Sequence, residues 1–134
     1  MGDWHNYDFA GKRALLVEDN LINTFVQQKM LEAVGFQVIT AENGKLGVEQ
    51  YKAFGEGYFD VILMDINMPI MDGWAATRQI RNLKRSDAPT IPIIAITTSD
   101  YQEDICKSEA AGMNEHLVKP IVPEVLFRCL TEYL

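Results

Sequence analysis

Four short apolar runs recur along the chain, and each is followed by polar or charged residues. They are residues 14–17 followed by Glu18 and Asp19, 61–64 followed by Asp65, 93–96 followed by Thr97, and 117–118 followed by Lys119. Such runs are typical of parallel strands that are covered on both faces. Ligands of open parallel sheets bind just beyond the carboxyl ends of the strands. These polar residues therefore lie where a functional site is expected.

The segments between the apolar runs have helical spacing, and this alternation predicts a doubly wound α/β domain. With 134 residues and 48% hydrophobic composition, the chain has room for one such domain and its core. Five strands are expected at about residues 13–18, 37–41, 61–65, 93–97 and 115–118, with a helix after each of them. The first helix is expected to follow Asn20 as its cap, with the apolar positions Ile22, Val26, Met30 and Val34.

The charge balance restricts the class of partner. The formal net charge of -7 argues against nucleic-acid binding, which depends on clustered lysine and arginine. A protein partner is expected, or a small anionic ligand that binds together with a metal.

The two cysteines and the hydropathy of the chain indicate the cellular compartment in which the protein is expected. Cys106 and Cys129 have no metal-binding or disulfide-framework spacing, so both are expected to be buried, reduced helix residues of a cytoplasmic protein. No apolar stretch approaches the ~20 residues that a membrane-spanning helix needs. The start of the chain lacks the regions of a signal peptide. No direct membrane contact is expected, although a longer parent protein could be tethered to the inner face of a membrane.

At the carboxyl edge of the predicted sheet, three carboxylates and one lysine should meet. At ~4 Å and an effective dielectric constant near 20, each pair of like charges costs about 4 kcal/mol, so a cation is needed. Lys119 supplies one positive charge, and oxygen ligands without histidine or cysteine favour Mg2+. Mg2+ usually combines with a phosphate oxygen, and aspartyl phosphate is a known covalent intermediate. We therefore predict that Asp65 accepts a phosphoryl group, with Lys119 and the Thr97 hydroxyl holding its oxygens.

Five motifs resemble the receiver domain of two-component response regulators. They are Val17-Glu18-Asp19-Asn20, Met64-Asp65-Ile66-Asn67-Met68-Pro69, Met71-Asp72-Gly73, Ile96-Thr97-Thr98 and Lys119-Pro120-Ile121. The resemblance implies a flavodoxin-like fold with strand order 2-1-3-4-5 and Mg2+-dependent transfer of phosphate from phosphohistidine to Asp65. It also implies that Glu18, Asp19, Asp65 and the backbone carbonyl of Asn67 hold the metal. Such a domain catalyses only its own phosphorylation and dephosphorylation.

The motifs around Asn20, Asn23 and Asp65 are similar to those of receivers attached to hybrid sensor histidine kinases. This similarity implies onward transfer to a histidine phosphotransfer domain, which docks on the first helix and on the loop after the last strand. The docking residues would lie near Leu21, Thr24 and Phe25 and in residues 120–122. A hybrid parent would itself be a histidine kinase, and the domain is expected to be a monomer or a weak dimer.

Two residues depart from the pattern of the family. Thr98 stands beside the phosphate position where receivers often have alanine, so its bulk could narrow access to the site. His116 stands where receivers usually have a tyrosine or phenylalanine that acts as a rotameric switch, and its polarity predicts an altered switch.

Three alternatives remain open from the sequence. The chain could be a stand-alone regulator, a Mg2+-dependent phosphatase that works through aspartyl phosphate, or a pseudo-receiver that binds a partner without phosphate. Asn67 argues against the phosphatase, because that position lacks a second catalytic acid.

Residues 1–11 are expected to be an N-terminal extension or a linker remnant, and residues 12–134 the receiver domain.

Overall fold

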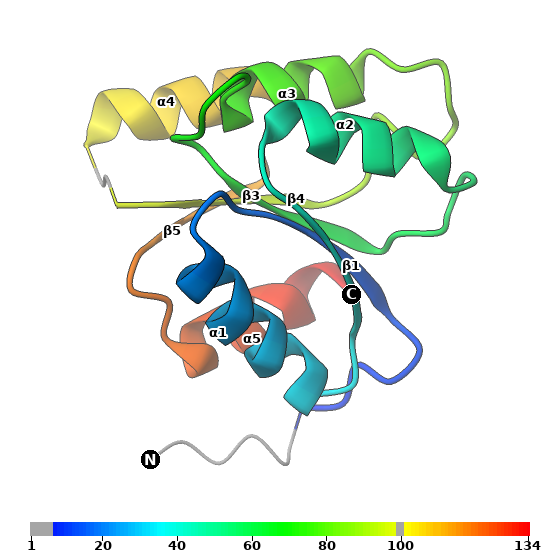
Figure 1. Ribbon diagram of the computed structural model, residues 1–134, viewed down its shortest axis with the longest axis vertical. Coiled ribbons are helices and arrows are strands. Elements are labelled where there is room, and N and C mark those ends of the chain that lie inside the picture. The colour runs from blue at the N-terminus through cyan, green and yellow to red at the C-terminus, as the bar shows by residue number, and fades with distance from the viewer. Residues whose placement is uncertain (1–6, 99–100) are drawn as a thin grey trace.

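The sheet has five parallel strands in the order β2-β1-β3-β4-β5, with helices on both faces. The computed structural model describes residues 7–98 and 101–134. The elements are β1 (Arg13–Val17), α1 (Leu21–Ala33), β2 (Gln37–Ala41), α2 (Gly44–Ala53), β3 (Val61–Asp65), α3 (Gly73–Arg81), β4 (Ile93–Thr97), α4 (Gln102–Ala111), β5 (Glu115–Val118) and α5 (Pro123–Tyr133). Helices α2, α3 and α4 cover one face, and α1 and α5 cover the other (Figure 1). The predicted fold and strand order are confirmed.

Both faces of the sheet are covered by helices, which explains why the inner strands β1, β3 and β4 are buried and mostly apolar. Successive side chains of a strand point to opposite faces. Leu15 and Ile62 accordingly belong to the core under α2 and α3, whereas Leu16 and Leu63 belong to the core under α1 and α5. The central strand β3 is buried at every position, including Asp65 at its end. The sheet therefore holds a carboxylate in a rigid and largely dry position.

Side-chain caps begin the helices that follow β1, β2 and β3. The side chains of Asn20, Asn43 and Asp72 accept hydrogen bonds from the backbone N–H groups three residues later. Such caps satisfy donors that a helix leaves unpaired in its first turn. Each cap also lets the chain turn sharply at the carboxyl edge of the sheet, so α1 and α3 begin close to the ends of β1 and β3.

Only the C-terminal part of the apolar stripe that predicted α1 faces the core: Val34 is buried and Met30 packs against the core. Ile22 and Val26 are 74% and 44% exposed, whereas Gln27 and Leu31 are buried. The side chain of Phe25 is 61% exposed as well. Helix α1 thus carries more apolar residues than its packing uses, and the surplus forms an exposed apolar face.

The segment just before β1 packs on the domain as an integral part of it. The Phe9 ring is 7% exposed and stacks on Phe36 with 4.9 Å between ring centroids. The Phe9 N–H donates to the carbonyl of Val34 at 2.7 Å. The Tyr7 ring lies 5.3 Å from that of Phe127 on α5. Of the predicted extension, residues 7–11 therefore close the end of the core between α1 and α5, and residues 1–6 lie outside the described part.

Replacement of Phe9 by alanine should lower the free energy of unfolding by about 2 kcal/mol, because it empties a buried site near a segment that can partly collapse. Chemical denaturation measures this change. Phe25→Ala is the matched control, since the same atoms are removed from an exposed position and little change is expected. Equal stability of Phe9→Ala and the parent protein would show that the segment does not belong to the folded unit.

The cysteine prediction is half right. Both cysteines are free, and Cys129 is buried in α5, but Cys106 is exposed. Cys106 lies on α4, whose buried residues are Ser108 and Ala111, so it falls on the outer side of that helix. Across residues 7–98 and 101–134, no helix has the length and apolar character needed to cross a membrane.

Candidate functional site

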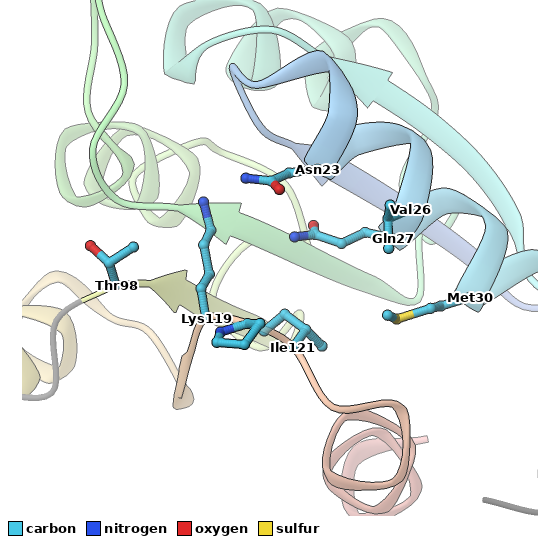
Figure 2. A pocket seen from close by; sticks show the side chains of 8 residues that line it. Asn23, Val26, Gln27, Met30, Thr98, Lys119 and Ile121 are labelled. Carbon is cyan, nitrogen blue, oxygen red and sulfur yellow. The ribbon is translucent and has the colours of Figure 1, made fainter. Parts of the chain in front are cut away.

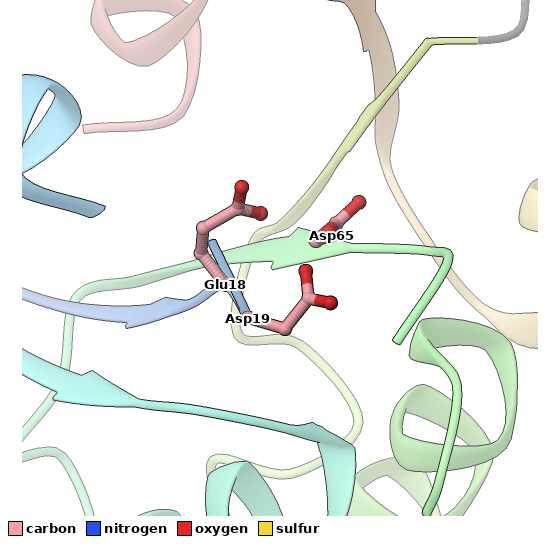
Figure 3. A group of neighbouring side chains, drawn as sticks. All are labelled: Glu18, Asp19 and Asp65. Atoms are coloured by element: carbon pink, nitrogen blue, oxygen red, sulfur yellow. The ribbon is translucent and has the colours of Figure 1, made fainter. Parts of the chain in front are cut away.

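Three carboxylates meet at the carboxyl ends of β1 and β3 (Figure 3). One oxygen each of Glu18, Asp19 and Asp65 lies within 4.8 Å of the others. Glu18 and Asp65 are buried, and Asp19 is exposed at the mouth of the site. The cluster forms because β1 and β3 are neighbours in register, with Val17 opposite Met64, so the residues that follow them meet. The sequence prediction placed these residues together for this reason.

Lys119 reaches this cluster from the segment that follows β5. Its ammonium nitrogen lies 3.0 and 3.2 Å from the two oxygens of Glu18 and 3.5 Å from Oδ2 of Asp65. The backbone N–H of Lys119 donates to the carbonyl of Thr97, which ties the segment to the end of β4. The Lys119–Pro120 peptide bond is cis. One lysine thus faces three carboxylates, and its closest partner is Glu18 rather than Asp65.

The environment of Asp65 favours its neutral form. Burial, hydrogen bonding to Glu18 and repulsion from Glu18 raise the pKa of Asp65 from 3.8 to about 8, and Lys119 acts in the opposite direction. A carboxyl group with this pKa is mostly protonated at neutral pH. A cation bound beside Asp65 would favour the ionised form, so the excess of negative charge makes the cluster suited to binding one.

Asn67 and Thr98 complete the walls of the site. They line a hollow of about 240 Å³ together with the acidic residues and Lys119. Thr97 is buried at the end of β4 and does not line this hollow. The structure also adds Asn23, whose amide nitrogen donates to Oε1 of Glu18 at 2.9 Å. In the sequence, Asn23 stood out only as part of a family motif. Composition gives no sign of a hydrogen bond between two side chains that lie five residues apart.

His116 lies away from the acidic cluster. Its Nδ1 atom is 3.3 Å from the hydroxyl oxygen of Ser108 on α4. The same hydroxyl accepts a hydrogen bond of 2.9 Å from the Trp74 indole on α3. A polar chain therefore joins β5 to α3 through the buried Ser108. The switch role of His116 remains a prediction, now with Ser108 and Trp74 as the contacts that a movement of the ring would change.

Gly73 holds the start of α3 against the end of β3. Its N–H donates to the carbonyl of Ile66 at 2.8 Å. A Cβ atom at this position would overlap the carbonyl oxygen of Asp65 and lie 2.9 Å from the Cα of Ile66. Only glycine allows the two backbones to approach this closely.

Gly73→Ala should lower the free energy of unfolding by about 3 kcal/mol, because rigid backbone atoms must move apart to admit the methyl group. Gly55→Ala is the control, since a Cβ at that position meets nothing within 4 Å. Denaturant titration of both variants measures the difference. If both variants unfold at the same denaturant concentration, the close approach at Gly73 is not a constraint on the fold.

The family model for the response regulator receiver domain matches residues 14–131. The chain belongs to this family. Among curated relatives, it is 42% identical over 123 residues to two-component system protein A of Emericella nidulans, which covers 91% of the chain and 17% of that protein. It is 36% identical over 133 residues to hybrid signal transduction histidine kinase B of Dictyostelium discoideum, covering 92% of the chain and 7% of that protein. The receiver thus spans a small part of these relatives.

Solved receiver structures share the fold over most of the chain. The receiver domain of a sensor histidine kinase from Pseudomonas aeruginosa, with a magnesium ion coordinated in its active-site cleft, has a TM-score of 0.81 and 37% identity. It covers 92% of this chain and 98% of its own length. A chemotaxis protein of Vibrio cholerae has a TM-score of 0.82 and 32% identity, and it covers 93% of this chain and all of its own. Receiver domains of this family act with histidine kinases and phosphotransfer proteins in phosphorelays.

Proposed function

We propose that this receiver accepts a phosphoryl group from a phosphohistidine onto Asp65. The observation that carries the proposal is the placement of Asp65: a buried carboxylate at the end of β3, with Glu18, Asp19 and Lys119 around it. In the reaction, a carboxylate oxygen of Asp65 attacks phosphorus. The bond between phosphorus and the imidazole nitrogen breaks, and that nitrogen keeps the electron pair; with a proton on the other ring nitrogen, the donor leaves as neutral imidazole.

The acidic cluster fits a magnesium ion. Its donors are carboxylate oxygens without nitrogen or sulfur, and together they carry more negative charge than Lys119 offsets. Glu18, Asp19, Asp65 and the carbonyl of Asn67 are the residues that would hold Mg2+. When bound, Mg2+ supplies positive charge that favours ionised Asp65 and neutralises oxygens of the phosphoryl group. A Mg2+-bound relative supports this assignment.

Lys119 and Thr97 would act on the phosphoryl group itself. Lys119 lies 3.5 Å from Asp65, so a small movement would bring its ammonium group to a phosphoryl oxygen on that residue. Thr97 ends the neighbouring strand, where its hydroxyl is assigned to a second oxygen. Thr98 lines the hollow and limits the space for an attacking water or imidazole. His116 is assigned an altered switch role through Ser108.

The partner would be a histidine phosphotransfer domain, and the parent protein a hybrid sensor histidine kinase. The exposed apolar face of α1 continues across a groove of about 360 Å³ to the segment after β5, where Ile121 lines the groove and Val122 is 53% exposed (Figure 2). Leu21 and Phe25 on α1 are 76% and 61% exposed. Apolar surface of this kind, next to a charged site, suits a helix that presents a histidine.

The proposal also covers the compartment, the oligomeric state and the contacts of the domain. We place it in the cytoplasm, as a monomer or weak dimer that contacts neither nucleic acid nor the membrane directly. The packing of Phe9 on Phe36 favours a domain that begins before residue 12.

Incubation with a small acyl phosphate tests the proposal. With Mg2+, the intact mass should increase by one phosphoryl group, and peptide mapping should place this group on Asp65. Without Mg2+, no increase is expected. If the protein binds Mg2+ and beryllofluoride but gains no phosphoryl group, the small donor does not react with it. The test is then repeated with a phosphorylated phosphotransfer domain as the donor. Failure to bind both reagents would favour the pseudo-receiver alternative.

A further inference from the structure

Asn23 connects the first turn of α1 to the acidic cluster. Its backbone N–H donates to the side chain of Asn20 at 3.0 Å, which fixes Asn23 within the capped turn. Its side-chain amide donates to Oε1 of Glu18 at 2.9 Å. In Figure 2 the Asn23 amide and the Lys119 ammonium group come from opposite walls of the groove and lie toward the same end of it. The helix cap thus places a hydrogen-bond donor on a carboxylate of the site.

The side chain of Glu18 is only 1% exposed, so its carboxylate depends on a few protein groups for its hydrogen bonds. Oε1 receives hydrogen bonds from both Asn23 and Lys119, and Oε2 receives one from Lys119. A buried carboxylate that loses a donor bears a large desolvation cost and tends to change position. The position of Glu18 therefore rests on Asn23 and Lys119 together.

The proposed phosphorylation changes this arrangement. Lys119 has to leave Glu18 in order to hold an oxygen of a phosphoryl group on Asp65, because one ammonium group cannot keep three close contacts with Glu18 and Asp65 and add a fourth. Asn23 is bound to the capped turn of α1 and has no reason to move. After the movement of Lys119, Asn23 is the side-chain donor in the described contacts that remains on the Glu18 carboxylate.

We propose that Asn23 is a positioning residue of this site: its amide holds Glu18 in place as a ligand for Mg2+ when Lys119 moves from Glu18 to the phosphoryl group. The inference rests on the proposed function and adds a residue to it. Partners that orient a metal ligand typically contribute 10- to 100-fold to metal affinity. Asn23 acts through Glu18 and does not touch the phosphoryl group.

Titration with Mg2+ alone, followed by calorimetry or by backbone amide chemical shifts, measures the contribution of Asn23 to Mg2+ affinity. Asn23→Ala should bind Mg2+ roughly 10-fold more weakly than the parent protein. Alanine favours helix, so the fold should be kept, and a thermal melt checks this. Gln28→Ala is the matched control, because it removes a side-chain amide from the same helix. In the described contacts, the Gln28 side chain bonds only to Glu32.

A double-mutant cycle with Glu18→Ala, which removes the oxygen that accepts the Asn23 amide, tests whether Asn23 acts through Glu18. In that background Asn23→Ala should have little further effect on Mg2+ affinity, since the ligand that Asn23 orients is already changed. Beryllofluoride titration at saturating Mg2+ tests the movement of Lys119. Asn23→Ala should weaken beryllofluoride binding by roughly threefold beyond its effect on Mg2+, because Glu18 then lacks both donors.

The outcomes separate the two proposals. If the parent protein does not bind Mg2+, the proposed function fails, whatever Asn23 does. If the parent protein binds Mg2+ and Asn23→Ala binds it equally well, the positioning role is overturned. An undiminished effect of Asn23→Ala in the Glu18→Ala background also overturns it. Unchanged beryllofluoride affinity at saturating Mg2+ would show that Lys119 stays on Glu18 in both states.

Discussion

Asparagine in place of Asp65 should give a protein that gains no phosphoryl group from an acyl phosphate at any concentration of Mg2+. The amide keeps the shape of the side chain but lacks the nucleophilic carboxylate oxygen that forms the bond to phosphorus. Intact mass after incubation with the donor measures the result. The loss should be complete, because Glu18 faces Lys119 and Asn23 rather than an open position for attack.

Asp60→Asn is the matched control for this loss. Asp60 lies just before β3, and its carboxylate accepts the backbone N–H of Arg13 at 2.8 Å, outside the acidic cluster. An asparagine oxygen can accept the same hydrogen bond, so this variant should be phosphorylated like the parent protein. A phosphoryl group on Asp65→Asn, located by peptide mapping on another residue, would contradict the assignment of the acceptor.

The same Asp65→Asn variant should become progressively more stable than the parent protein as pH rises, when no divalent metal is present. The pKa of Asp65 is raised from 3.8 to about 8 in the folded protein. Between these values the folded state keeps a proton that the unfolded state has released, so each step up in pH favours unfolding of the parent protein. Asparagine does not titrate, and its advantage should grow between about pH 4 and pH 8 and then level off.

Thermal melts of both proteins across this pH range, in the presence of a chelator, measure the effect. Saturating Mg2+ should reduce the difference at high pH, because a bound cation stabilises the ionised form of Asp65 and binds the parent protein more tightly. A difference in melting temperature that stays constant from pH 4 to pH 8 would show that Asp65 titrates at an ordinary value.

The elements built from strong local signals could be predicted from the sequence. The expected ranges for β2, β3, β4 and β5 coincide with the observed strands. Strands β3 and β4 are buried apolar runs with sharp ends, and Gly112, with a φ of 107°, ends α4 in the left-handed conformation that favours glycine. The acidic cluster followed from these strands, because the parallel order brings their carboxyl ends to one edge.

Features that depend on contacts between distant segments could not be predicted in the same way. The burial of Phe9 depends on the position of Phe36 across the core, which no local pattern specifies. Ile22 and Val26 on α1 are exposed although they share the spacing of the buried Val34, so periodicity alone could not show which part of the stripe faces inward. The preference of Lys119 for Glu18 over Asp65 is a difference of half an ångström between side chains, which belongs to the folded structure alone.

Methionine in place of Lys119 should slow phosphorylation by an acyl phosphate roughly 100- to 1,000-fold at saturating Mg2+, because it removes a charge that stabilises the phosphoryl group during transfer. Loss of the lysine should also move the pKa of Asp65 further upward, since Lys119 lowers it in the parent protein. The initial rate of phosphate incorporation measures the change. Lys29→Met is the control, since Lys29 is exposed on α1, where it contacts Glu32 and the Phe25 ring away from the acidic cluster.

The Mg2+ affinity of Lys119→Met separates two roles of the lysine. If Lys119 acts on the phosphoryl group, Mg2+ binding should not weaken, because removal of a positive charge from beside three carboxylates favours a cation. The rate should then fall while the affinity for Mg2+ is kept or increased. If rate and affinity fall together in a protein that remains folded, the main role of Lys119 is to hold Glu18 in position, and the assignment of its ammonium group to the phosphoryl oxygen is wrong.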